Sequence, residues 1–103
     1  MIQIAIVEDE EIYVKQLTEY IQKYQTERGK SIKVTVFGDG EDIIENYSGG
    51  FDIILMDIQM RFMDGMTTAE KIRQMDQKVI IMFITNMIQY AVRGYEVDAM
   101  DYV

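Results

Sequence analysis

The chain opens with a short apolar stretch that ends in two acids, Ile2-Gln3-Ile4-Ala5-Ile6-Val7-Glu8-Asp9. A run this rich in Ile and Val is typical of a strand that is buried on both faces of a parallel sheet. The pattern occurs twice more, because residues 51–56 are followed by Asp57 and residues 79–84 by Thr85. The sequence therefore predicts three buried strands, each ending in an oxygen-bearing side chain.

The rest of the chain predicts helices that alternate with two further strands. Residues 32–37 alternate apolar side chains with Lys or Thr, which is typical of an edge strand, and residues 99–103 are expected to begin a fifth strand. Helices are expected over about 10–28, 41–47 and 67–75, with a less regular helical stretch over 87–93. This alternation indicates an α/β fold, a doubly wound parallel sheet with right-handed crossovers.

Apolar residues at helical spacing predict which face each helix buries. In the first helix these residues are Tyr13, Leu17, Tyr20, Ile21 and Tyr24, and in the third they are Ala69, Ile72 and Met75. Gly29 is a plausible C-terminal cap for the first helix. Asp64-Gly65 is interpreted as a turn in which the glycine supplies a positive φ.

The strand ends predict a metal site. Neighbouring strands lie about 4.8 Å apart, and parallel strands share one carboxyl edge, where such sheets carry their working site. We therefore expect Glu8, Asp9, Asp57 and Thr85 to lie in one small acidic pocket. Carboxylates this close repel one another, and a hard divalent cation such as Mg²⁺ relieves that repulsion.

Each motif alone also has a structural interpretation. The acids from Glu8 to Glu11 suit the start of a helix, a lone Asp57 after a strand suits a turn, and Thr85 could cap the following segment. The metal hypothesis depends on all of them ending strands of one parallel sheet.

Composition excludes several classes of function. The chain has 103 residues, a formal net charge of −8, no Cys and no His, which argues against direct nucleic-acid binding, disulfides, thiol chemistry and a Ser-His-Asp triad. A Walker A loop and a glycine-rich dinucleotide loop are also missing. The sequence shows neither a signal peptide nor an apolar run of the ~20 residues that span a bilayer, so we expect a soluble, cytoplasmic, single-domain protein.

Taken together, several segments resemble the response-regulator receiver domain of bacterial two-component systems, most closely those receivers that precede LytTR-type DNA-binding domains. These segments are Val7-Glu8-Asp9-Glu10, Ile54-Leu55-Met56-Asp57-Ile58-Gln59-Met60, Met63-Asp64-Gly65-Met66, Phe83-Ile84-Thr85-Asn86 and Tyr95-Glu96-Val97-Asp98-Ala99-Met100-Asp101-Tyr102. The resemblance covers the whole chain in order. It implies a flavodoxin-like sheet of five parallel strands in the order 2-1-3-4-5.

The resemblance also implies a role for each matched residue. Asp57 corresponds to the phosphoacceptor, and Asp9 with Glu8 to the acidic pair that binds Mg²⁺. The backbone carbonyl of Gln59 corresponds to a further metal ligand. Thr85 corresponds to the hydroxyl residue that contacts the phosphoryl group, and Tyr102 to the aromatic residue that changes rotamer on activation.

Two features depart from the family pattern. Arg61-Phe62 occupy a loop where the family usually carries Pro, and this chain has no Pro. The chain stops at Val103, one residue past Tyr102, whereas the family continues with a Lys and a last helix. We therefore expect residues 1–103 to be a C-terminally incomplete receiver domain, truncated near the fifth strand, that forms a homodimer or otherwise self-associates.

The expected function is a phosphorylation-dependent switch, because the resemblance implies that a sensor histidine kinase donates a phosphoryl group to Asp57. Such a chain modifies itself and is not a classical enzyme. DNA would be contacted only through an absent C-terminal domain that regulates transcription. The alternative is a phosphorylation-independent receiver that serves as a protein-interaction module. A Mg²⁺-dependent phosphohydrolase would need an acid two residues after Asp57, where Gln59 stands.

Overall fold

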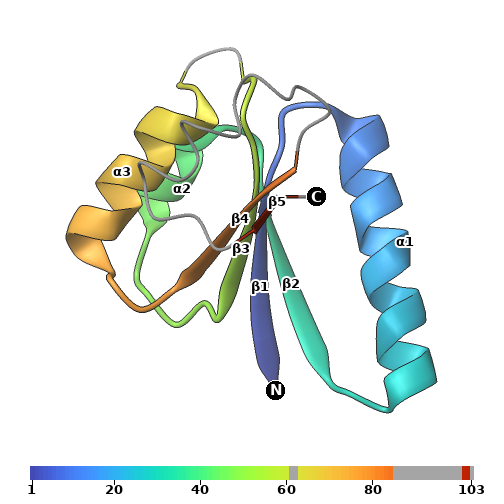
Figure 1. Ribbon diagram of the computed structural model, residues 1–103. Coiled ribbons are helices and arrows are strands. Elements are labelled where there is room, and N and C mark those ends of the chain that lie inside the picture. The colour runs from blue at the N-terminus through green and yellow to red at the C-terminus, as the bar shows by residue number, and fades with distance from the viewer. Residues whose placement is uncertain (61–62, 85–100, 103) are drawn as a thin grey trace.

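The computed structural model describes residues 1–60, 63–84 and 101–102, the last two by their backbone. Strands and helices alternate along the chain (Figure 1), as the sequence predicts. The elements are β1 (Ile2–Val7), α1 (Glu11–Arg28), β2 (Ile32–Phe37), α2 (Gly40–Asn46), β3 (Ile53–Asp57), α3 (Gly65–Met75), β4 (Ile80–Ile84) and β5 (Asp101–Tyr102). The stretch expected to be helical over 87–93 lies outside the described residues.

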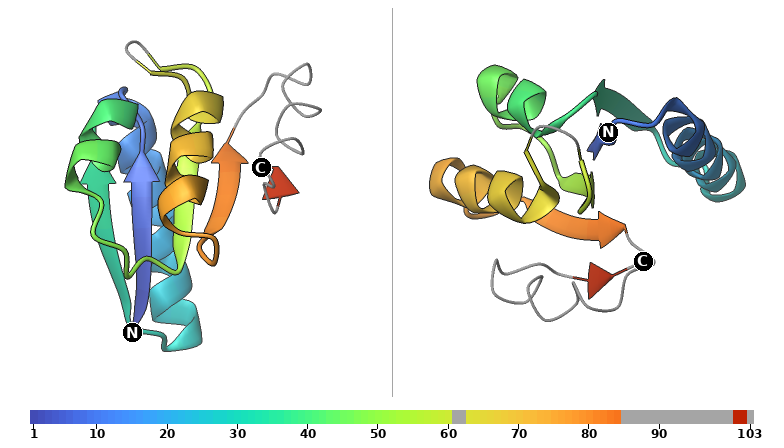
Figure 2. Two further views of the ribbon diagram at one scale, coloured as in Figure 1. Left: turned by 90° about the vertical axis from the view of Figure 1, so that its left-hand side faces the viewer. Right: turned by 90° about the horizontal axis from the view of Figure 1, so that it is seen from above.

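The strands form one parallel sheet in the order β2-β1-β3-β4-β5, so the predicted doubly wound fold and strand order are confirmed. β2 is an edge strand, as its alternating sequence indicates. Helix α1 covers one face of the sheet, and α2 with α3 covers the other (Figure 2). Asp57 is the last residue of β3, where it pairs with Ile84, whereas the sequence prediction ended that strand one residue earlier.

The face under α2 and α3 carries the main hydrophobic core. Alternate residues of β1, β3 and β4 point into it, because side chains along a strand face opposite sides of the sheet. Its buried members are Ala5, Val7, Phe37, Ile43, Ile54, Met56, Ile58, Met66, Ala69, Ile72, Val79, Ile81 and Phe83. Met75 is 50% exposed, so its predicted burial is wrong. One helical turn after Ile72, the buried face of α3 is occupied by Asp76, the C-cap residue, and not by Met75.

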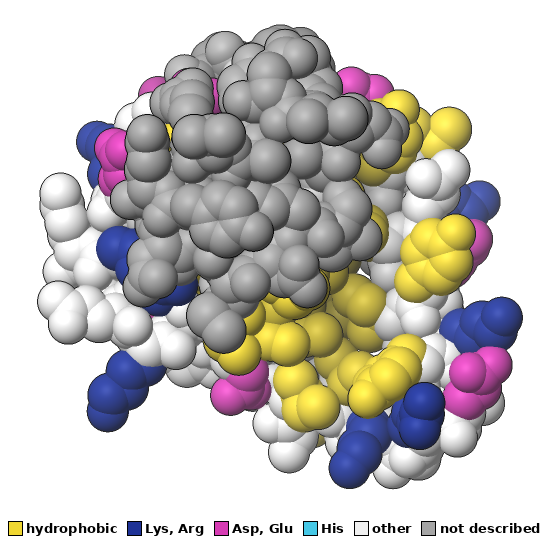
Figure 3. Space-filling model, viewed as in Figure 1, with side chains coloured by type: hydrophobic (Ala, Val, Ile, Leu, Met, Phe, Trp, Pro, Cys, Tyr) yellow, Lys and Arg dark blue, Asp and Glu magenta, His cyan; other side chains and the backbone are white. Residues whose placement is uncertain are grey.

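Helix α1 covers the opposite face only in part. It buries none of its residues fully, although Ile4 and Ile6 are buried in the strand beneath this face. Leu17 and Ile21 are partly buried, but Tyr13, Tyr20 and Tyr24 are 48%, 72% and 48% exposed, so their predicted burial is wrong. Figure 3 shows hydrophobic side chains gathered in a hollow beside this helix.

The C-terminal end of α1 follows its sequence signal. Gly29 adopts a left-handed conformation with φ 62°, and its N–H donates to the carbonyl of Gln25. A residue with a Cβ adopts this conformation at a cost, whereas glycine does not. The cap ends α1, and β2 begins three residues later at Ile32.

A polar link ties the end of α2 to the turn between α3 and β4. The Tyr47 hydroxyl donates to Asp76 Oδ2 at 2.6 Å, and Asp76 Oδ1 accepts from the backbone N–H groups of Lys78 and Val79 at 3.0 and 3.2 Å. The hydrogen bond from Tyr47 is the main cause that lowers the pKa of Asp76. The carboxylate form of Asp76 therefore holds both elements at this end of the sheet.

We expect Tyr47→Phe to lower the free energy of unfolding by about 1 kcal/mol at neutral pH, because Asp76 loses a donor. A carboxyl whose pKa is lowered by folding stabilises the protein above its ordinary pKa, and this contribution is lost as the pH falls. The difference between the two proteins should therefore shrink in acid. Urea denaturation at several pH values measures it, with the exposed Tyr20→Phe as the control. An equal effect of both substitutions would contradict the link.

Candidate metal centre at the sheet edge

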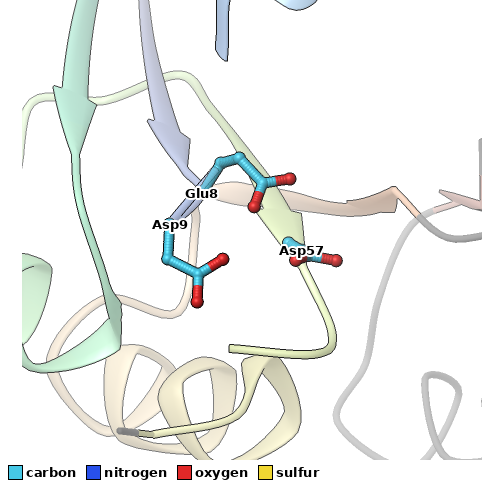
Figure 4. Close-up of side chains that lie close together, drawn as sticks. All are labelled: Glu8, Asp9 and Asp57. Carbon is cyan, nitrogen blue, oxygen red and sulfur yellow. The ribbon is translucent and has the colours of Figure 1, made fainter. Parts of the chain in front are cut away.

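Three carboxylates meet where β1 and β3 end. The two strands are neighbours, with Val7 opposite Met56, so the residues that follow β1 lie beside Asp57. Carboxylate oxygens of Glu8, Asp9 and Asp57 all lie within 4.8 Å of one another. Figure 4 shows the three side chains side by side at this edge. The predicted acidic cluster is therefore confirmed for these three residues.

The backbone fixes Glu8 in a buried position at this edge. Its N–H donates to the carbonyl of Phe37 at the end of β2 (3.1 Å), and the side chain is only 7% exposed. Its Oε2 accepts from the backbone N–H of Glu10 at 3.2 Å. Glu8 is thus held between the strand ends, while Asp9 and Asp57 are partly exposed and accessible to solutes.

Burial and mutual repulsion decide the protonation of the cluster. Burial is the largest cause that raises the pKa of Glu8 to about 8, and the neighbouring charge of Asp57 adds to it. Burial also raises the pKa of Asp57, while hydrogen bonds from Glu8 and from the backbone N–H groups of Gln59 and Ile58 lower it. The cluster therefore retains a proton at neutral pH when no cation is bound.

This donor set fits a hard divalent cation. Mg²⁺ prefers carboxylate and carbonyl oxygens, keeps several waters, and is usually bound through one or two carboxylates. Three carboxylate oxygens within 4.8 Å, at a partly exposed edge, offer such ligands and leave room for water. A bound cation would also offset the repulsion between the carboxylates, which adds to burial in raising the pKa values of Glu8 and Asp57.

We expect the metal-free protein to lose stability as the pH rises from about 5 to 8, because folding raises the pKa of Glu8. The folded state holds a proton that the unfolded state releases near the ordinary pKa of 4.5. Because a ligating carboxylate must lose its proton, Mg²⁺ should raise the melting temperature more at about pH 8 than at about pH 6.

Glu8→Gln is the matched control for this prediction, because it keeps the side-chain size and removes the titrating group. Melting temperatures of both proteins, measured with and without Mg²⁺ across this pH range, test the expectation. If the metal-free proteins show the same slope of melting temperature against pH, Glu8 does not titrate as described.

The remaining predicted site residues lie partly outside the described residues. Gln59 lies two residues beyond β3 and is exposed; its backbone N–H donates to the Asp57 carboxylate. Thr85 lies outside the described residues, directly after the end of β4. Tyr102 belongs to β5, where its backbone pairs with Phe83, but its side chain is not described. The roles of the Gln59 carbonyl, Thr85 and Tyr102 stay predictions.

Close packing at Gly65 was missed by the sequence analysis, which expected a positive φ there. The glycines with positive φ are Gly29, Gly49 and Gly50 among the described residues. Gly65 is needed for space, because a Cβ would overlap the carbonyl of Asp57 and lie 2.9 Å from Ile58 Cα. The sequence alone cannot distinguish a glycine that is required for a positive φ from one that is required for close packing.

Comparisons with known proteins agree with this fold. The family model for the response regulator receiver domain matches residues 4–103. The sensory transduction protein LytT of Bacillus cereus is 32% identical over 105 residues, which cover 100% of this chain and 41% of LytT. The chain thus spans about two fifths of that relative's length. Among the described residues, no helix is long and apolar enough to cross a membrane.

Solved structures show the same architecture. The response regulatory domain of MrkE from Klebsiella pneumoniae is 30% identical, has a TM-score of 0.85, and is matched over 99% of this chain and 81% of that one. The regulator TrrA of Thermotoga maritima, solved in complex with Mg²⁺ and BeF, has a TM-score of 0.85 at 24% identity over 100% of this chain and 85% of that one. The chain belongs to the response regulator receiver domain family.

Proposed function

We propose that this domain is a phosphorylation-dependent signalling switch in which Asp57 accepts a phosphoryl group. The observation that carries the proposal is the cluster of Glu8, Asp9 and Asp57 at the carboxyl edge of a receiver-type sheet. Asp57 is the member that ends a strand and is partly exposed, so an incoming phosphoryl group can reach it. The neighbouring acids supply the metal ligands.

In the proposed reaction, an Asp57 carboxylate oxygen attacks the phosphorus of a phosphohistidine on a sensor kinase. The new O–P bond forms as the N–P bond breaks, and the electron pair returns to the imidazole nitrogen of the kinase. Phosphoryl transfer depends mainly on positioning and charge neutralisation. Mg²⁺ held by Glu8, Asp9, Asp57 and the Gln59 carbonyl would supply that neutralisation.

The chain's own residues perform the positioning. The backbone N–H groups of Ile58 and Gln59 hold the Asp57 carboxylate, and the β-sheet register fixes it beside Glu8 and Asp9. The domain thus catalyses its own modification. The same water-accessible pocket is where the aspartyl phosphate is hydrolysed.

The output of the switch rests on residues that the resemblance identifies. Thr85 contacts the new phosphoryl group, and Tyr102 changes rotamer in response. The resemblance to receivers that precede LytTR-type domains implies a DNA-binding effector domain that regulates transcription in the cytoplasm. The relative YpdB of Escherichia coli, 33% identical over 101 residues, is a transcriptional regulatory protein, which supports this output. Self-association of the 103-residue chain stays a prediction.

Incubation with acetyl phosphate and Mg²⁺ tests the proposal, because a small donor replaces the kinase. Intact-mass spectrometry should find one added phosphoryl group, and excess chelator should prevent its formation. A chain that stays unmodified and binds no Mg²⁺ would instead be a phosphorylation-independent interaction module.

A further inference from the structure

Gly65, at the start of α3, lies directly against the end of β3. The N–H of Gly65 donates to the carbonyl of Ile58 at 2.8 Å, so the first residue of α3 lies directly on the end of β3. A Cβ on Gly65 would overlap the Asp57 carbonyl. The start of α3 and the strand end that carries Asp57 are therefore packed backbone to backbone.

A second close approach lies at Gly40, the first residue of α2. A Cβ on this buried glycine would overlap Thr68 Oγ1 and would lie 3.0 Å from the Met63 carbonyl and 3.2 Å from Met63 Cβ. Met63 belongs to the β3–α3 loop, and Thr68 to the first turn of α3. Helix α2 therefore approaches both Met63 in the loop and Thr68 in α3 through Gly40, a residue without a side chain.

The groups that face Gly40 cannot give way freely. Thr68 is fully buried, and its hydroxyl donates to the carbonyl of Asp64 at 2.8 Å. Asp64 in turn caps α3, since its Oδ1 accepts from the N–H of Thr67 at 2.8 Å. A displacement of Thr68 therefore moves the residue that precedes Gly65.

We infer that Gly40 is a positioning residue for the metal centre, although it is not part of it. A methyl group at this position displaces Met63 and Thr68, and through Asp64 and Gly65 it shifts Ile58 and Gln59. Those two residues donate the backbone hydrogen bonds that hold the Asp57 carboxylate. The start of α2 thus sets the positions of Ile58 and Gln59, which hold the acceptor carboxylate.

The expected consequence for Gly40→Ala is a weaker metal site in a folded protein. Mg²⁺ affinity should fall on the order of tenfold, as for other residues that orient metal ligands. The backbone amide NMR signals of Ile58 and Gln59 should shift already in the metal-free protein. Without the steric overlap, replacing a helical Gly by Ala would leave the loop unchanged and favour the helix.

Ile43→Val is the matched control, because Ile43 is fully buried in the same helix and the loss of one methylene from the core lowers stability. It should lower the melting temperature while the Ile58 and Gln59 amides and the Mg²⁺ affinity stay as in the wild type. This separates a positioning role from a general loss of stability.

A double-mutant cycle with Thr68→Ala tests the steric route. In the Thr68→Ala background, which lacks Oγ1, Gly40→Ala should have a smaller effect on the amides and on Mg²⁺ affinity than in the wild-type background. The double variant also provides a folded reference if Gly40→Ala alone does not fold. Unchanged Ile58 and Gln59 amides in Gly40→Ala, or an equal effect in both backgrounds, would overturn the inference.

The metal readout rests on the proposed function, whereas the metal-free amide shifts do not. If the wild-type chain binds no Mg²⁺, the proposed function fails at that step. The amide NMR shifts of the metal-free protein still decide whether Gly40 sets the positions of Ile58 and Gln59.

Discussion

Asp57→Asn is expected to abolish phosphoryl uptake from acetyl phosphate in the presence of Mg²⁺. The amide is a poor nucleophile and cannot displace the leaving group, while its size and its place at the end of β3 are unchanged. Burial raises the pKa of the Asp57 carboxyl, which means that the folded protein disfavours its charged form. Because the substitution removes that charge, the metal-free protein should remain folded. Intact-mass spectrometry and melting temperatures measure the two effects.

Glu70→Gln provides the matched control for Asp57→Asn. It also converts an acid to an amide, but at an exposed position on α3. Its phosphoryl uptake should equal that of the wild type. An Asp57→Asn protein that gains the adduct as fast as the control would remove Asp57 from the mechanism.

Asp9→Asn is expected to weaken Mg²⁺ binding on the order of tenfold or more, because the cluster loses one of its three carboxylates. Phosphoryl uptake should fall in parallel when Mg²⁺ is limiting, and should recover in part when Mg²⁺ is in excess. An NMR titration that follows the amides of residues 8–9 and 57–59 gives the affinity. The rate comes from the mass of the protein at successive times.

The control for Asp9→Asn is Glu11→Gln, an exposed acid in the first turn of α1. It removes the same charge near the site without removing a member of the cluster. If both substitutions weaken Mg²⁺ binding equally, the effect is the long-range field of the acidic surface and Asp9 is not a ligand.

The sequence predicted the sheet and the acidic cluster because both follow from short-range rules. Apolar runs such as residues 2–7 identify buried strands, and parallel strands bring their carboxyl ends to one edge. The meeting of Glu8 and Asp57 follows from these two rules once β1 and β3 are neighbours. The strand order itself came from the family resemblance.

The buried face of each helix was predicted less well, because the spacing of apolar residues does not show how much of that face the sheet covers. Leu17 and Tyr20 belong to the same apolar pattern of α1, yet Leu17 is partly buried and Tyr20 is 72% exposed. The sheet lies beneath only part of that stripe. At Gly65 the sequence likewise indicated a special residue without showing that the reason was the contact with Asp57.

The most direct test of the central claim is to locate the phosphoryl group after reaction with acetyl phosphate and Mg²⁺. Borohydride reduces an acyl phosphate to an alcohol, which marks the modified carboxylate permanently. Peptide mapping of the wild-type chain should find the reduced residue at Asp57 alone, and no mark when Mg²⁺ is removed. A mark at Glu8, Asp9 or any other acid, or one that forms without Mg²⁺, would contradict the account.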